Sequence, residues 1–87
     1  MTYPLTLDRD QKLIRDANRK LVAYCFDGLT IETIFRVLNG ERVPLALPLR
    51  RCQVAGLDAS ILDAVGQVVC YCGMDDAWDI IERLSVR

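Results

Sequence analysis

The sequence contains no histidine, no Cys-x-x-C pair and no long hydrophobic run. Without histidine, the side chain that most often serves as a general base near neutral pH is missing, as is the usual partner of cysteine in mixed zinc sites. The phosphate-binding glycine loops and nucleophile motifs of common enzymes are also missing. We therefore expect a protein that is not an enzyme, with no cofactor and no bound metal.

The chain also lacks the apolar segment of roughly 18–20 residues that would cross a bilayer. Its first residues, 1–4, have neither the basic start nor the apolar core of a signal peptide. These features predict a cytoplasmic protein without a membrane partner. Because disulfides are rare in that reducing compartment, the cysteines are expected to be small core hydrophobes; they are Cys25, Cys52, Cys70 and Cys72.

Charge is nearly balanced overall but unevenly distributed along the 87 residues. Residues 1–55 carry nine basic and six acidic side chains, a net charge of +3, whereas residues 56–87 carry two basic and six acidic ones, a net charge of −4. This division predicts a basic end that could face phosphates, although ordinary variation between short segments would give the same counts. An apolar content of 52% fits one globular domain spanning residues 1–87.

Apolar residues recur at helical spacing in five segments. A first helix is predicted over about residues 8–26, with an optional break near residue 16, and a second begins at Thr30 and ends at about Leu38. The remaining three are predicted from Pro48 to Gly56, from Asp58 to Cys72, and after Asp75. Neither strand alternation with hairpin turns nor an internal repeat is recognised. The predicted fold class is all-α, a compact bundle of four to six short helices.

The segment 28–44 has the features of a helix that reads DNA. Gly28 supplies a turn, Leu29 fills the junction between two helices, and Ile34 and Val37 hold the second helix against the first. Asn39-Gly40 then ends the helix. This arrangement predicts a helix-turn-helix over about residues 18–40.

Residues 30–40, followed by residues 41–44, resemble the end of the recognition helix and the following turn of lambda-repressor-like (Xre-type) regulators, and residues 30–40 also resemble the LacI-type headpiece. Residues 49–62 are similar to the fourth helix of the Xre pattern, so that the resemblance covers about residues 22–62. It implies a homodimeric transcriptional regulator of the kind carried by phages and other mobile elements, bound to a double-stranded operator. The acidic helices over residues 57–87 would form the dimer. The implied DNA-binding residues are Thr30, Glu32, Thr33, Arg36, Arg42, Arg50 and Arg51.

A second interpretation is a small acidic helical module that binds a protein, as an inhibitor or adaptor, and does not bind DNA. The sequence pI of about 5.2 agrees with it, and aromatic residues are common at interface hot spots. Its candidate contacts are Tyr24, Phe35 and Trp78. Phe35 could instead belong to the core, and Trp78 to the core or to a dimer seam. A helix that presents Thr33 and Arg36 beside Arg50 and Arg51 would favour DNA.

Overall fold

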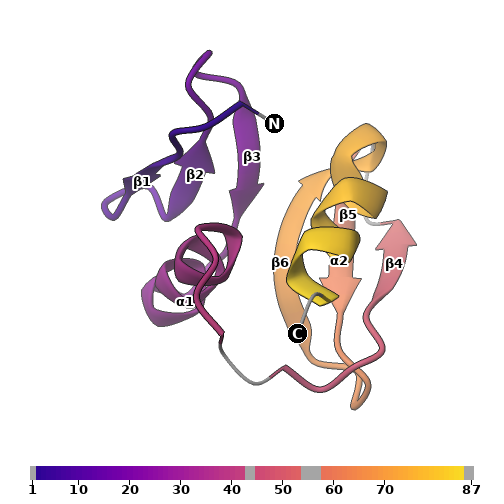
Figure 1. Cartoon of the computed structure of the whole chain (residues 1–87). Helices are drawn as coiled ribbons and strands as arrows, with labels where there is room; N and C mark the ends of the chain where they lie inside the picture. Colours follow the sequence, from indigo (N-terminus) through magenta and orange to yellow (C-terminus); the bar gives the residue numbers. More distant parts are fainter. Residues whose placement is uncertain (1, 43–44, 54–57, 86–87) are drawn as a thin grey trace.

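The protein folds as an antiparallel sheet with helices, not as a helical bundle (Figure 1). The computed structural model describes residues 2–42, 45–53 and 58–85. Within these residues the sheet has six strands and there are two α-helices, so the all-α prediction is wrong. The elements are β1 (Thr6–Asp8), β2 (Leu13–Arg15), β3 (Leu21–Tyr24), α1 (Gly28–Leu38), β4 (Arg50–Gln53), β5 (Asp58–Leu62), β6 (Val68–Gly73), the 3-10 helix η1 (Met74–Asp76) and α2 (Ala77–Ser85).

The strand order is β1-β2-β3-β6-β5-β4. Read inwards from the two edges, β1, β2 and β3 therefore correspond in position to β4, β5 and β6. Three strands followed by α1 make a first repeat, and three strands followed by η1 and α2 make a second. The repeats join in the middle of the sheet, where β3 pairs with β6 at Tyr24 and Tyr71. The molecule is therefore a pseudo-dimer within one chain, with an approximate two-fold axis near this tyrosine pair.

The two repeats are also related in sequence. Aligning residues 14–25 with residues 61–72, a shift of 47, gives identical residues at six of the twelve positions. The identical pairs are Ile14/Ile61, Asp16/Asp63, Ala17/Ala64, Val22/Val69, Tyr24/Tyr71 and Cys25/Cys72. The expectation that the chain has no internal repeat is therefore wrong. The repeat is difficult to recognise because the sequence similarity is confined to one short hairpin.

The hairpin turns of the two repeats are built in the same way. The carboxylate of Asp16 accepts hydrogen bonds from the backbone N–H groups of Asn18 and Lys20, at 2.9 and 3.0 Å. Asp63 accepts equivalent bonds from Val65 and Gln67, at 3.0 and 2.9 Å. Aspartate favours such turns because its short side chain satisfies the N–H groups that the turn leaves free.

The core lies between the sheet and its helices. Ile14 and Ile61, at equivalent positions of the two repeats, are fully buried. From α1 the core receives Ile31, Ile34, Val37 and Leu38, and from α2 it receives Ala77, Ile80 and Leu84. The helices also contact each other and thereby close the core. Within the described residues, neither helix is long and apolar enough to cross a membrane.

Two predicted helices are hairpins instead. Residues 8–26 contain the last residue of β1 and all of β2 and β3, and residues 58–72 contain β5 and most of β6. In both, apolar residues of two adjacent strands imitate a helical period, while the aspartate at the turn interrupts it. Gly66, with a φ of +88°, and the run Val68–Cys72 are better suited to a turn and a strand.

Of the remaining three helix predictions, one is wrong and two are confirmed. The third predicted helix contains β4, and its last residues, 54–56, lie outside the described residues, as do 43–44. The second and the last are confirmed as α1 and α2. However, the N-cap of α1 is Asp27 and not Thr30, and Asp75, predicted to cap the last helix, lies in η1 before α2 begins at Ala77. Because β3 stands where a first helix is required, no helix-turn-helix exists over residues 18–40. The proposed dimerisation helices over 57–87 are likewise β5 and β6 followed by α2.

Three of the four cysteines are buried, as predicted, but Cys52 on β4 is exposed. Burial raises the pKa of Cys25 to about 12, helped by Asp27, and that of Cys72 to about 11. Burial also raises the pKa of Cys70. Buried thiols with raised pKa values react slowly because the thiolate is the nucleophile.

We expect iodoacetamide at pH 8 to modify a single thiol of the folded protein, that of Cys52, and to modify all four after unfolding. Intact mass spectrometry counts the adducts. The Cys52→Ser variant should take up no label while folded, and two or more adducts on the folded wild type would contradict the buried placement of the other three.

Candidate binding groove

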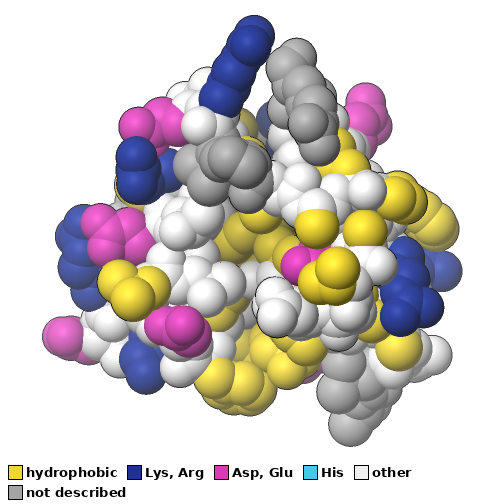
Figure 2. Space-filling view, turned by 90° about the horizontal axis from the view of Figure 1, so that it is seen from below, with side chains coloured by type: hydrophobic (Ala, Val, Ile, Leu, Met, Phe, Trp, Pro, Cys, Tyr) yellow, Lys and Arg dark blue, Asp and Glu magenta, His cyan; other side chains and the backbone are white. Residues whose placement is uncertain are grey.

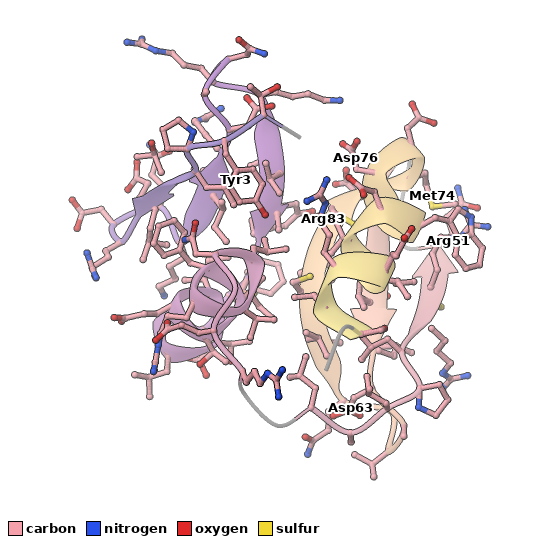
Figure 3. The ribbon with its side chains drawn as sticks, in the orientation of Figure 1. Tyr3, Arg51, Asp63, Met74, Asp76 and Arg83 are labelled. Atoms are coloured by element: carbon pink, nitrogen blue, oxygen red, sulfur yellow. The ribbon has the colours of Figure 1, made fainter. Side chains whose placement is uncertain are left out.

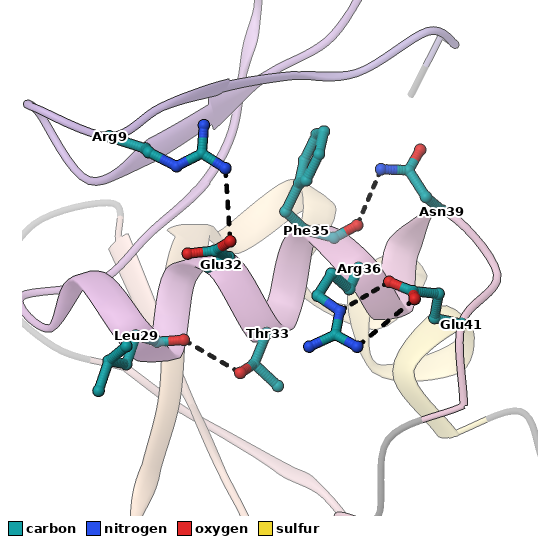
Figure 4. A network of polar contacts seen from close by, with 8 residues as sticks. All are labelled: Arg9, Leu29, Glu32, Thr33, Phe35, Arg36, Asn39 and Glu41. Carbon is teal, nitrogen blue, oxygen red and sulfur yellow. Dashed lines mark hydrogen bonds and ion pairs between the residues drawn. The ribbon is translucent and has the colours of Figure 1, made fainter.

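The polar residues of α1 that were predicted to face DNA are engaged within the protein (Figure 4). Glu32 pairs with Arg9 at 3.3 Å, and Arg36 pairs with Glu41 at 2.8 Å. The hydrogen bond and charge of Glu41 raise the pKa of Arg36. The Thr33 hydroxyl donates to the carbonyl of Leu29 at 3.0 Å. A base edge would have to compete with these partners.

The three arginines predicted near the DNA backbone lie on other surfaces. Arg42, after α1, lines a cavity of about 330 Å³ together with Tyr3 and Arg83. Arg50 and Arg51 are on β4, an edge strand that contacts β5 and α2, whereas α1 contacts β2 and β6. The structure therefore does not bring Arg50 and Arg51 beside α1, as the DNA interpretation requires.

The aromatic residues predicted to meet a protein partner have three different environments. Tyr24 stacks on Tyr71 with ring centroids 5.3 Å apart. Its hydroxyl donates to Asp58 at 2.8 Å, and this bond is the main reason that the pKa of Tyr24 rises to about 12. Phe35 is half-buried and packs against the core. Trp78 is 62% exposed, so it does not belong to the monomer core.

Beside the central strand pair, each repeat places its helix against the hairpin of the other repeat. β3 and β6 pair only at Tyr24 and Tyr71. The first residues of each strand are therefore not paired with the other strand, and they lie beside a helix instead. Val68 and Val69 lie beside α1, in what we call the α1–β6 groove. Leu21 and Val22 lie beside η1 and α2, in the α2–β3 groove.

The linings of the two grooves correspond residue by residue. Asp63, Gln67, Val68 and Val69 in the α1–β6 groove match Asp16, Lys20, Leu21 and Val22 in the α2–β3 groove. On the helix side the shift is 46, because the first repeat has one additional residue before its helix. Thr30, Thr33 and Ile34 then match Asp76, Asp79 and Ile80.

Charged residues close the α2–β3 groove. Lys20 reaches Asp76 at 3.5 Å, and the cavity left there is about 20 Å³. In Figure 3, Asp76 lies near the start of α2 and Asp63, which lines the α1–β6 groove, lies at the opposite end of the sheet. In the α1–β6 groove the positions of Lys20 and Asp76 hold Gln67 and Thr30, which cannot form an ion pair. That groove has a cavity of about 250 Å³.

The open groove has apolar walls and an apolar rim. Its lining includes Leu29, Ile34, Leu45, Val68 and Val69. Thr30 also lines the groove, and its hydroxyl donates to Asp27 at 3.2 Å. Seen from below, hydrophobic side chains gather in a hollow between two lobes of the surface (Figure 2).

The groove continues towards the pseudo-two-fold axis. A second cavity of about 230 Å³ shares Thr30, Val68 and Val69 with it and adds Phe26 and Tyr71. Phe26 is 75% exposed and Leu29 is 78% exposed. Where the first repeat has Phe26, the second has Gly73, so the α2–β3 groove lacks this rim.

Sequence reasoning missed the groove. Leu29 was expected to fill a helix junction but is exposed, and Val68, within the helix predicted from Asp58 to Cys72, is an exposed residue of β6. Comparing the chain with itself at a shift of 47 would have revealed the hairpin repeat and the exchange of Lys20 for Gln67, and a shift of 46 over the helices would have aligned Thr30 with Asp76. Among the described residues, no cluster of three His, Cys, Asp or Glu side chains could hold a metal ion.

Comparison with protein-family models, with curated proteins and with solved structures finds no match. The resemblance to Xre-type and LacI-type regulators therefore receives no support from them. The geometry of the two grooves is the basis for the function proposed below.

Proposed function

We propose that this protein is a small protein-interaction module and that the α1–β6 groove binds an apolar segment of a partner protein. One observation supports this proposal most strongly. Two grooves of the same architecture occur in one chain, and the charged pair that closes one is replaced by uncharged residues in the other. A contiguous exposed apolar surface is typical of an interaction site.

Size and charge define the occupant. A volume of about 250 Å³ is below the roughly 300–1,000 Å³ of pockets that enclose drug-sized ligands, but it suits one or two large apolar side chains. Among the described residues that line the groove there is no Lys or Arg, and the carboxylate of Asp63 is occupied by two backbone N–H groups. A partner segment with neighbouring Leu, Ile or Phe side chains complements this surface, since a charge placed there would lose water without gaining a counterion.

A DNA-binding regulator is the less supported alternative. Its candidate residues lie on separate surfaces, and two of them form ion pairs within the protein. The four free cysteines suit a reducing compartment, so we also propose a cytoplasmic location for the interaction.

Panning of a random twelve-residue peptide display library against the immobilised protein tests the groove. Enriched peptides are expected to share two or three closely spaced large apolar residues. A synthetic peptide of the enriched sequence should bind the Val68→Lys variant about tenfold or more weakly, because the ammonium group would be buried without a partner on binding. Isothermal titration calorimetry measures the affinities.

The chain provides its own matched control. Leu21 occupies in the closed groove the position that Val68 has in the open one, and the two are 36% and 45% exposed. Leu21→Lys should leave the affinity unchanged. Equal losses in both variants, or no enriched peptide that depends on Val68, would refute the proposal. Binding of duplex DNA that weakens steeply with salt would support the regulator instead.

A further inference from the structure

The edge strand β4 has a different kind of exposed surface. All of its residues, Arg50–Gln53, are exposed. β4 pairs with β5 on one side, and none of the strands within the described residues pairs with its other side. An edge of this kind can accept a further strand through backbone hydrogen bonds.

Two adjacent arginines give this edge its charge. Successive side chains of a strand point to opposite faces of a sheet. Arg51 is on the face that carries α2, where its guanidinium lies over the ring of Trp78 at 4.8 Å, and Arg50 is therefore on the other face. Neither forms an ion pair with a residue in the described part of the chain. Figure 3 shows Arg51 between β4 and α2.

We propose that β4 binds an acidic, extended segment of a protein as a seventh strand of the sheet. Backbone hydrogen bonds would give affinity, and carboxylates on the two faces of the added strand would meet Arg50 and Arg51. The exposed ring of Trp78 adds an apolar contact beside Arg51, and Trp and Arg are the residue types most enriched at interface hot spots.

Charge also argues against a second copy of this chain as the occupant. Two β4 strands paired edge to edge would bring the arginine pairs of both copies together, and like charges across a strand pair are destabilising. The same arginines that attract an acidic strand therefore oppose self-pairing, a common device of exposed edges.

Trp78 is the only tryptophan of the chain, so its fluorescence reports directly on this edge. A ten-residue peptide in which Glu-Glu pairs alternate with Thr-Thr pairs places carboxylates on both faces of a strand, and it is expected to change the emission in a saturable way. The matched peptide with Gln in place of Glu should bind about tenfold more weakly, and a Glu peptide N-methylated on every residue should not bind. Loss on N-methylation is specific to strand addition, since contacts by side chains alone would tolerate it.

Arg50→Gln and Arg51→Gln should each weaken the Glu peptide about threefold to tenfold. Arg15→Gln, a control at an exposed arginine on β2, should have no effect. Equal binding of the Glu and Gln peptides, or full binding of the N-methylated peptide, would overturn the proposal. So would duplex DNA that binds more tightly than the peptide, because it would assign the arginines to phosphates. The Val68→Lys variant should behave as wild type, which keeps this test separate from that of the α1–β6 groove.

Discussion

Replacing Ile61 by alanine is expected to lower the free energy of unfolding by about 2–5 kcal/mol, the usual cost of truncating a fully buried Ile. Ile61 is 0% exposed and lies on β5 opposite Cys70 of β6, which is also 0% exposed. The cavity left by the shorter side chain would be enclosed by buried residues, which can relax only partly to fill it. Urea unfolding followed by circular dichroism gives the change as a shift in midpoint at constant slope.

The control is Val65, in the turn of the same hairpin. A helix over residues 58–72 would bury Ile61 and Val65 together, whereas the hairpin leaves Val65 73% exposed. Val65→Ala should therefore change the free energy of unfolding by less than about 0.5 kcal/mol. Similar losses in the two variants would favour the helix over the sheet. Ile14→Ala, at the equivalent position of the first repeat, should resemble Ile61→Ala.

Part of the fold was predictable from the sequence. The period of Ile31, Ile34, Val37 and Leu38 is that of an amphipathic helix, and these residues are the ones that α1 buries. A stop signal at Asn39-Gly40 was also correctly placed. Both features depend on residues close together in the chain, so local rules are sufficient.

The hairpins were not predictable in this way. Ile14 and Val22 are buried by elements distant in sequence, and their spacing fits a helix as well as two strands joined by a turn. What decides between them is the pairing of β3 with β6, a contact between residues 47 apart. Apolar spacing alone therefore cannot distinguish a helix from a hairpin where pairing between distant strands determines the structure.

The candidate groove depends on the same long-range pairing. Leu29, Val68 and Phe26 acquire a common surface only when the second hairpin is placed beside α1. By contrast, the substitutions that distinguish the two grooves are visible in the sequence once the repeat is known. Gln67 for Lys20 and Thr30 for Asp76 remove both charges of the closing ion pair.

Installing that ion pair in the open groove is expected to reduce binding of the selected apolar peptide by about 10- to 100-fold, or about 1.4–2.8 kcal/mol. The double variant is Thr30→Asp with Gln67→Lys, the residues of the closed groove at the matching positions. The pair itself would be exposed and weak. Its effect on the peptide comes from the two charges that binding would have to strip of water, and from the side chains that would fill the cavity.

The double variant needs a folding control because Asp27, the N-cap of α1, accepts a hydrogen bond from the Thr30 hydroxyl. A carboxylate at position 30 would face that of Asp27, with the new lysine as a counterion. Thermal unfolding by circular dichroism establishes that the variant is folded at the temperature of the binding measurement. The single Gln67→Lys substitution leaves the cap intact and should already weaken the peptide, by a smaller factor.

The reverse exchange separates the groove from general effects of charge. Lys20→Gln with Asp76→Thr removes the ion pair of the α2–β3 groove and should leave the affinity of the α1–β6 groove for the peptide unchanged. It should also open a second, weaker site, since Leu21, Val22 and Ile80 provide an apolar lining there, although Gly73 in place of Phe26 leaves it without a rim. Calorimetry would then show a second binding event. If the closing pair fails to weaken the peptide in the first variant, the absence of charge is not what makes the α1–β6 groove a binding site, and the function proposed from it is refuted.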